Sequence, residues 1–250
     1  MSIQASELKL YGSAVMPDDD SATAIGGAIN TAIKMEFTDI TPSGAVEMLS
    51  SASGDTTQTV TIYGRDSAGT IVSEVKTLNG VSVVSFTTTF ERILKAVMSG
   101  AATGTVTIRK ASAGATLITL EPGITQVRRP FYAVNTPESG SVTYYEKVFY
   151  KNTNGTLTLS SGVIKEAADP SGKVTFGLPA TIDDTGTNGT GNNRQVAPSG
   201  ITFNSSDKNI ANGQNLTAGS AQGIWLALTL ASTDAAAKTT YDLRCEGTTT

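Results

Sequence analysis

Residues 57–80, TQTVTIYGRDSAGTIVSEVKTLNG, and residues 99–110, SGAATGTVTIRK, decide the fold class of this chain. Apolar and polar residues alternate in TVTIY (59–63) and again in TVTIR (105–109). A period of two is typical of a strand with one buried face. The Asn-Gly pair that ends the first stretch supplies the positive φ angles of a tight hairpin turn. The sequence therefore predicts a compact antiparallel β unit.

The composition supports the same fold class. Of 250 residues, 39% are hydrophobic and only 16% are charged, and the chain contains 25 glycines. Long surface helices usually carry many Glu, Lys and Arg side chains, so these proportions favour short strands joined by polar loops. A chain of this length can bury one large core or two moderate ones. We therefore expect an all-β protein built from antiparallel β-sandwich or barrel-like domains.

Short strands follow one another closely through the centre of the chain. The predicted strands lie near residues 45–50, 57–64, 70–78, 81–87, 92–98, 104–110 and 115–120. This spacing is typical of an immunoglobulin-like sandwich. One of these segments is ambiguous, because the apolar residues from Phe90 to Val97 also fit one face of a helix. The flanking glycine and the strand-rich neighbours favour a strand.

The flanking regions contain the same alternation. Strands are predicted at 6–11 and 33–40 before the central unit, and at 174–178 and 224–230 after it. In the last of these, four residues form the longest alternating apolar row of the chain, and Trp225 points to the opposite face. Trp225 is therefore predicted to mark either a second buried layer or a contact with a partner.

Two irregular segments separate these elements. Residues 124–140 contain two prolines and a turn-rich end, which predicts a linker. Residues 181–198, TIDDTGTNGTGNNRQVAP, form a long polar loop rich in glycine. A loop of this length inside a compact domain is typical of a functional or mobile segment.

Charge and hydropathy argue against two classes of partner. The formal net charge is −4, with 18 basic and 22 acidic residues, and the densest basic site is the pair Arg128-Arg129. A protein that neutralises phosphates concentrates Lys and Arg, so we expect no nucleic-acid partner. No apolar run approaches the roughly 20 residues that span a bilayer, so we expect no membrane partner. The first residues lack the basic-then-apolar order of a secretory signal.

The residue types needed for common catalytic sites are scarce. The chain has no histidine, which removes the usual general base and the commonest transition-metal ligand, and one cysteine, Cys245. The acidic triplet at 18–20 lacks the spacing of a calcium loop. The adjacent acids at 183–184 point to opposite sides of a strand and fit poorly as a glycosidase pair. We therefore expect no enzymatic activity, no cofactor and no metal, and we expect Cys245 to be a buried strand thiol.

Two parts of the chain resemble structural proteins of tailed bacteriophages. The central run TVTIYGRDSAGTIVSEVKTLNG (59–80), followed by VSFTTTFERILKAVMSGAATGTVTI (84–108), is similar to a pattern common in these proteins. The flanks are similar to another group of phage and prophage virion proteins. In that group a start like SELKLYGSA (6–14) precedes segments like YYEKVFYKNTNGTLTL (144–159), NRQVAPSGITF (193–203) and AGSAQGIWLALTL (218–230).

The resemblance implies a discontinuous arrangement of domains. In the flank group, much less chain separates the N-terminal strands from the segment like YYEKVFYKN than in this sequence. We therefore expect one β domain from residues 1–43 plus 128–250, and an inserted immunoglobulin-like β-sandwich at 44–127. Insertion at an exposed loop is physically reasonable when the termini of the inserted module lie close together.

The resemblance also implies a function. We expect a structural component of a bacteriophage particle that decorates or cements the outer capsid surface. Its partners would be the major capsid protein or other virion proteins and further copies of itself, and it would be made in the cytoplasm of the host bacterium. One alternative is a tail, neck or head-closure subunit. A second is a carbohydrate-binding surface module for host attachment, with an aromatic platform drawn from Tyr144, Tyr145, Tyr150 and Trp225.

Three places in the sequence are candidates for contact with a partner. The N-terminal strand could pair with the edge of a neighbouring subunit, or be an ordinary core strand. The two adjacent arginines could bind an acidic partner, or be solvated in the linker. Together with the tryptophan, the candidate contact residues are Leu8, Leu10, Tyr11, Arg128, Arg129 and Trp225.

Overall fold

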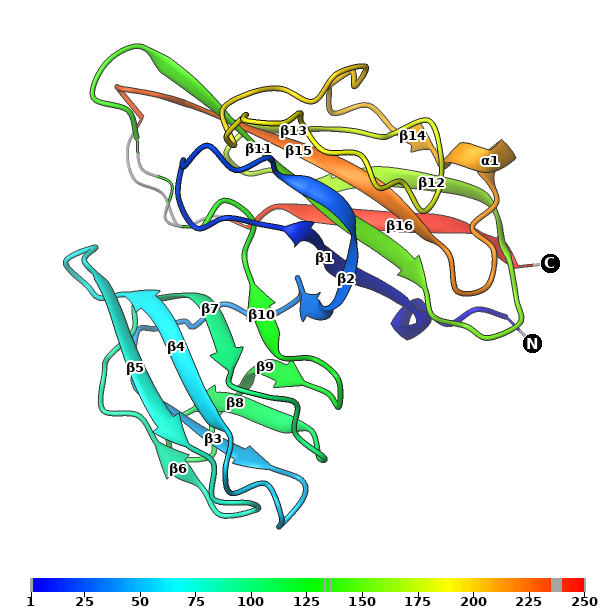
Figure 1. Cartoon of the computed structure of the whole chain (residues 1–250). Helices are drawn as coiled ribbons and strands as arrows, with labels where there is room; N and C mark the ends of the chain where they lie inside the picture. The colour runs from blue at the N-terminus through cyan, green and yellow to red at the C-terminus, as the bar shows by residue number, and fades with distance from the viewer. Residues whose placement is uncertain (1, 133, 135, 235–239, 250) are drawn as a thin grey trace. The chain divides into compact units, whose positions relative to one another are not determined.

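Strands make up almost all of the regular structure in this computed structural model, which describes residues 2–132, 134, 136–234 and 240–249 (Figure 1). Helical turns among these residues are η1 (Ala5–Glu7) and α1 (Ala211–Gln214). The sheets are open, and the strand pairs described are antiparallel except for β2 with β10. The predicted all-β fold class, with antiparallel sheets of the sandwich type, is confirmed.

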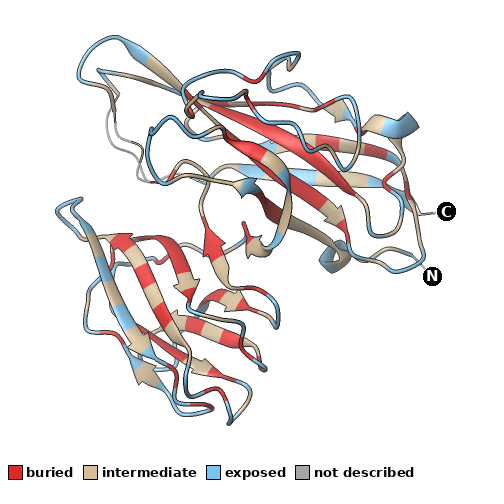
Figure 2. Cartoon of the chain, in the orientation of Figure 1, coloured by how far each residue is buried: buried red, intermediate tan, exposed pale blue. Residues whose placement is uncertain are grey.

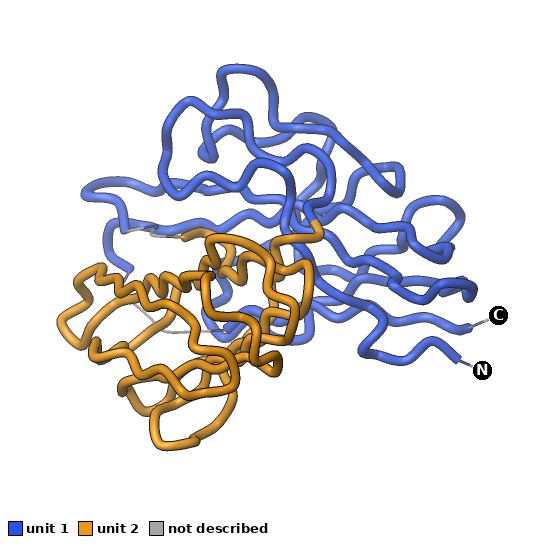
Figure 3. Tube along the Cα trace, turned by 60° about the horizontal axis from the view of Figure 1, so that its bottom comes forward, with its two compact units in different colours: residues 1–30, 134–250 blue, residues 31–133 orange. Residues whose placement is uncertain are grey.

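The chain forms two compact units (Figure 3). Unit 1 combines Met1–Asn30 with Val134–Thr250, and unit 2 is the continuous segment Thr31–Ala133. Unit 1 is therefore discontinuous in sequence, and unit 2 interrupts it.

The junctions between the units differ from the domain bounds expected at 43/44 and 127/128. Strand β2 (Gly26–Lys34) begins in unit 1 and ends in unit 2, where Ile33 and Lys34 pair with β10 (Gln126–Arg128). The compact units therefore place residues 31–43 and 128–132 with the inserted unit, and the pairing of β2 with β10 lies within it. Independent folding of the two units stays a prediction.

Unit 2 contains two open sheets that share a core. One has the order β6-β3-β8-β9, and the other contains the order β10-β7-β4-β5. Their strands are β3 (Val46–Ser50), β4 (Thr59–Arg65), β5 (Ile71–Thr77), β6 (Val84–Ser85), β7 (Arg92–Met98), β8 (Val106–Lys110) and β9 (Thr116–Leu120). Burial alternates along β4 and β8 as their sequences predict (Figure 2): Val60, Ile62, Val106 and Ile108 are fully buried.

The ambiguous segment at 92–98 is a strand. Strand β7 pairs antiparallel with β4 on one side and with β10 on the other. Five of its seven residues are buried, so side chains on both of its faces are covered. Apolar residues on both faces of β7 are buried, so its sequence lacks the strict alternation of a half-buried strand, which explains why it also fitted a helical face.

Three of the sequence-based predictions for elements of unit 2 are wrong. The strand expected at 33–40 overlaps only the end of β2, which stops at Lys34. The chain from residue 35 to residue 40 is irregular, although Thr38 N donates a hydrogen bond to Leu117 O at 2.8 Å. The strand expected at 81–87 is reduced to β6. The linker expected at 124–140 begins inside the fold, because β10 pairs with β7.

Unit 1 also contains two sheets. The larger follows the order β13-β15-β11-β1 and then β2, and the smaller follows β14-β12-β16. The strands are β1 (Leu8–Val15), β11 (Ser141–Asn152), β12 (Leu159–Ala168), β13 (Val174–Gly177), β14 (Lys208–Asn209), β15 (Ala221–Ala231) and β16 (Asp242–Thr249). Tyr150 of β11 donates from its hydroxyl to Leu243 O of β16 at 2.7 Å and so ties the two sheets together.

The core of unit 1 lies along β11 and β15. These strands pair over eleven positions, from Ser141 with Ala231 to Lys151 with Ala221. Seven consecutive residues of β15, from Ala221 to Ala227, are buried, so both faces of the strand are covered. Strand β1 pairs with the other side of β11, which joins residues 8–12 to residues 148–152.

Candidate functional site

The N-terminal candidates lie on an interior strand. Leu8 and Leu10 are half-buried in β1, and Tyr11 is buried. Strand β11 lies on one side of β1 and β2 lies on the other. Both edges of β1 are therefore occupied by strands of the same chain, and the interpretation of β1 as an ordinary core strand accounts for these three residues.

The two adjacent arginines are built into unit 2, and the interpretation that they are solvated in a linker is wrong. Arg128 is 1% exposed, and its guanidinium carbon lies 5.7 Å from the centre of the Tyr132 ring. Arg129 forms an ion pair with Asp39 and donates from Nε to Ile93 O at 2.9 Å. Burial lowers the pKa of Arg129 to about 10. Both arginines therefore hold parts of unit 2 together.

Trp225 is part of the core of unit 1. Its side chain is 2% exposed and packs against Gly26, where an added Cβ would lie 2.8 Å from Cη2 of the indole. Gly26 also has φ +99°, a conformation that favours glycine. Of the two roles predicted for Trp225, the structure accounts for the second buried layer.

A buried lysine anchors the polar loop at 181–198. Lys147 of β11 is fully buried and lies opposite Trp225 in the pairing with β15. Its Nζ donates to Gly27 O at 3.0 Å and to Gly186 O at 2.8 Å, and it forms an ion pair with Asp184. Burial lowers the pKa of Lys147, and the neighbouring Asp184 carboxylate opposes that shift. One ammonium group therefore ties the loop to the start of β2.

A second buried charge lies on the opposite face of β11. Arg194 is 2% exposed, and its guanidinium pairs with Asp20 at 2.8 Å and with the buried Glu146 at 3.7 Å. The backbone of Arg194 also accepts a hydrogen bond from Tyr145 N at 2.6 Å, beyond the point where β1 stops pairing with β11. The loop therefore continues the hydrogen bonding of the sheet.

An asparagine fixes the middle of the same loop. Asn188 is 5% exposed; its Oδ1 accepts from Ile25 N at 2.9 Å, and its Nδ2 donates to Asn193 O at 2.7 Å and Val196 O at 3.0 Å. With the two charged groups, this side chain gives the loop a defined conformation. The middle of the loop, which the sequence predicted to be a functional or mobile segment, is therefore anchored by side-chain hydrogen bonds.

Sequence reasoning missed these anchors, although one signal was present. Glu146 and Lys147 stand side by side in a strand that is otherwise apolar and aromatic, YYEKVFY. Because adjacent strand residues point to opposite faces, two charges there imply a partner on each face. The partners, Asp184 and Arg194, both lie in the 181–198 loop.

The acidic candidates serve structural roles. Asp183 accepts a hydrogen bond from Ala221 N at 2.8 Å, and its neighbour Asp184 pairs with Lys147. Asp19 accepts from Ser21 N at 3.0 Å, and Asp20 pairs with Arg194. Within the described ranges, no three His, Cys, Asp or Glu side chains gather in a way that could hold a metal ion.

The single thiol has little nucleophilic character. Cys245 is half-buried in β16 and forms no disulfide. Burial and the nearby Glu246 raise the pKa of Cys245 to about 12. Since the thiolate is the reactive form, this thiol stays protonated near neutral pH.

The aromatic residues proposed for a sugar platform do not form one. Tyr144, Tyr150 and Trp225 are buried inside unit 1. Tyr145 packs its ring against Phe203, with the ring centres 5.3 Å apart. Stacking on a sugar needs exposed aromatic faces, so this cluster gives no support to a carbohydrate-binding role.

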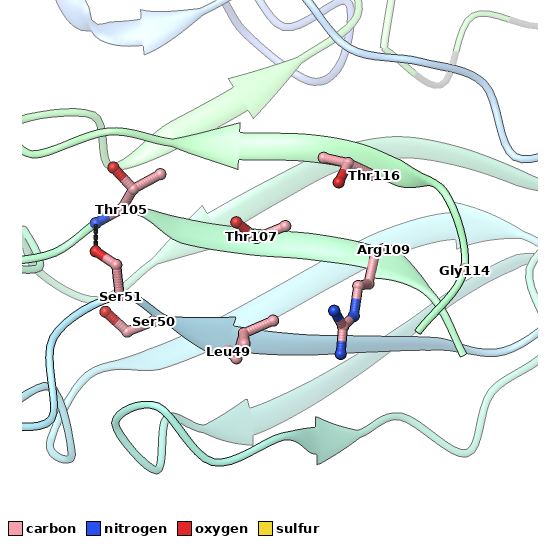
Figure 4. A pocket seen from close by; sticks show the side chains of 8 residues that line it. All are labelled: Leu49, Ser50, Ser51, Thr105, Thr107, Arg109, Gly114 and Thr116. Atoms are coloured by element: carbon pink, nitrogen blue, oxygen red, sulfur yellow. Dashed lines mark hydrogen bonds between the residues drawn. The ribbon is translucent and has the colours of Figure 1, made fainter. Parts of the chain in front are cut away.

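One surface depression lies on the outer face of β3 and β8 in unit 2 (Figure 4). It has a volume of about 250 Å³ and is lined mainly by Ser and Thr side chains and by Arg109. The Arg109 guanidinium pairs with Glu47 at 2.8 Å, and Glu47 also accepts from Ser112 N and Ala113 N. The charge in the depression is therefore already balanced, and no acid, base and nucleophile converge there.

A comparison with known proteins finds no matching family model, no matching curated protein and no matching solved structure. Among the residues that the structure describes, no helix has the length and apolar character needed to cross a membrane.

Proposed function

We propose that this chain is a structural component of a bacteriophage particle, which binds the outer surface of the capsid and stabilises it. The observation that carries the proposal is the resemblance of both the central run and the flanks to virion structural proteins. The structural findings are compatible with it. The buried charged groups described above hold loops and strands in place, and the open depression on β3 and β8 lacks the convergent polar groups of a catalytic pocket.

The physical basis of such a role is avidity. Each copy on a symmetric shell needs only a modest interface, because many copies bind the same lattice. The combined affinity then exceeds that of a single contact, although no new kind of contact is formed. A rigid all-β scaffold suits this task, since little conformational freedom is lost on binding. The tethered 181–198 loop adds to this rigidity, because Lys147 and Arg194 hold it to unit 1.

The proposal is tested with particles of the phage or prophage that encodes the chain. Particles made with and without the gene are compared by quantitative mass spectrometry and by electron microscopy. We expect the chain in a fixed ratio to the major capsid protein, extra density on the capsid exterior, and DNA release at lower temperature when the chain is absent. Absence of the chain from purified particles would overturn the proposal.

A reconstitution experiment adds a control. Purified chain is added to particles that lack it and is then sedimented with them, beside an unrelated acidic protein of similar size. We expect saturable binding of the chain and none of the control protein. Density in a ring at the neck or tail, with a bare capsid, would instead identify a tail, neck or head-closure subunit.

A further inference from the structure

Strand β5 forms an open edge of unit 2. It lies at the end of its sheet and pairs with β4 on one side, from Arg65 with Ile71 to Thr59 with Thr77. Figure 1 shows β5 as the outermost strand of this layer. The pairing has no bulge, so β5 is straight and regular over its seven residues. Regular edge strands without proline present a template for another strand.

The register shows which backbone groups of β5 face outward. Leu78 N donates to Gln58 O, and Asp66 N donates to Thr70 O. Because hydrogen-bonded and non-bonded pairs alternate along an antiparallel ladder, the even-numbered residues of β5 bond to β4. The N–H and C=O groups of the odd-numbered residues, from Ile71 to Thr77, therefore point away from the sheet.

The same odd-numbered residues have exposed side chains. Burial alternates along β5, and its apolar residues Ile71 and Val75 are 45% and 56% exposed. The even-numbered Glu74 and Lys76 share the opposite face and lie 3.0 Å apart as an ion pair. Edge strands are usually shielded by a proline, a bulge or charged side chains, including charges that point inward. Strand β5 has no proline and no bulge, and its two inward-facing charges, Glu74 and Lys76, neutralise each other as an ion pair. On the exposed face of β5 stand two apolar side chains and two hydroxyl groups.

We propose that the β5 edge binds the β5 edge of a second copy of this chain, as an antiparallel pair with a two-fold axis at Val75. The charges on β5 favour a second copy and select this register. An axis at Glu74 would place two carboxylates directly opposite each other, which is destabilising. An axis at Val75 places Glu74 opposite Lys76 of the second copy, and the symmetry repeats that pair.

The same register satisfies the open edge. Val75 meets Val75 of the second copy on the exposed face, and Ser73 meets Thr77 of the second copy on either side. All three residues have outward N–H and C=O groups, so each pair forms backbone hydrogen bonds across the interface. The dimer forms in solution without particles, so this inference does not depend on the proposed function.

The first test measures the mass of the full-length chain by sedimentation equilibrium over a series of concentrations. We expect a monomer–dimer equilibrium, and we expect Val75→Lys to raise the dissociation constant about tenfold or more, because two lysines then face each other at the axis. Val196→Lys is the matched control, since Val196 is 40% exposed and lies in unit 1. A wild-type monomer at every concentration, or a dimer that Val75→Lys leaves unchanged, would overturn the proposal.

The second test measures the register by disulfide formation in a Cys245→Ser background. Val75→Cys should form a covalent dimer with itself, because the two residues face each other at a Cα separation of about 5.5 Å, which a disulfide spans. Ser73→Cys and Thr77→Cys should each stay monomeric alone and cross-link when mixed. A covalent dimer of Ser73→Cys alone, with none from Val75→Cys, would contradict the register. Urea unfolding of each variant checks that the fold is intact.

Discussion

At the scale of single residues, Lys147 is a fully buried charge of unit 1. A buried ammonium is costly unless it is paired and hydrogen-bonded, and here three backbone carbonyl groups and the Asp184 carboxylate satisfy it. We expect Lys147→Met to keep the volume of the side chain but leave these acceptors unpaired. Unit 1 should lose about 3 kcal/mol of stability, measured by urea unfolding.

Lys151 provides the control for that variant. It lies four residues along the same strand, and its ammonium donates to Gly219 O at an exposed position. Exposed polar contacts of this kind contribute little, so Lys151→Met should change stability by about 0.5 kcal/mol or less. Equal losses for the two variants would mean that the buried contacts of Lys147 do not stabilise the loop.

Glu74 should make the stability of unit 2 depend on pH. Burial opposes ionisation, but the N–H groups of Thr88 and Thr87 and the ammonium of Lys76 outweigh it and lower the pKa of Glu74 from 4.5 to about 2. A group whose pKa falls on folding stabilises the protein above its unfolded pKa, and that contribution disappears as the pH falls through the folded value.

The test compares wild type with Glu74→Gln by urea unfolding between pH 6 and pH 2. The wild type should be more stable by about 2 kcal/mol at pH 6, and the difference should vanish between pH 4.5 and pH 2. A gap that stays constant down to pH 2 would contradict the role of the Glu74 charge.

At the scale of elements, Gly64 fits the irregularity between β4 and β7. The register of the two strands shifts between Tyr63 and Gly64, and an added Cβ at Gly64 would lie 2.4 Å from Arg92 O and 2.5 Å from the Phe90 ring. Glycine in a strand often marks such a close approach. We expect Gly64→Ala to cost about 3 kcal/mol, measured by thermal and urea unfolding.

Gly100 is the matched position for this change. An added Cβ there meets no atom within 4 Å, and Gly100 lies in the same unit. Gly100→Ala should therefore be neutral within about 0.5 kcal/mol. If Gly64→Ala proved equally neutral, β4 and β7 would be able to move apart at the bulge without a loss of stability.

Elements with one buried face were predictable from sequence, and those fixed by distant partners were not. The alternation in β4 and β8 follows from local sequence alone, because the side-chain period of a strand is two. Strand β10 contains only three residues and exists because β2 and β7 lie on its two sides. Its apolar content is too small to mark it, so its sequence read as a linker.

The candidate contact residues follow the same division. Tyr11 and Trp225 were recognised as strand residues, but local periodicity cannot tell whether a face meets the core or a partner. The anchors of the 181–198 loop depend on pairs such as Lys147 with Asp184, which are far apart in sequence. Such pairs are fixed by tertiary packing, and a single sequence carries no direct record of it.

At the scale of the whole molecule, the division into two units predicts separable responses to mutation. Each unit has its own buried core, and unit 2 is continuous in sequence. We expect Lys147→Met to speed amide hydrogen exchange in peptides of unit 1 and to leave unit 2 unchanged, and Gly64→Ala to do the reverse. Mass spectrometry of exchanged, digested protein measures this directly. Uniform acceleration in both variants would mean that the chain unfolds as one cooperative block.

The pairing of residues 8–12 with residues 148–152 has a consequence for synthesis. A ribosome delivers all of unit 2 before β11 has been polymerised, so the edge of β1 that pairs with β11 must stay open during that time, although β2 on its other side is already synthesised. The inserted unit can fold during that delay. Residues 8–12 leave the exit tunnel before unit 2 but complete their sheet only after it, and we expect them to be open to a chaperone during that interval.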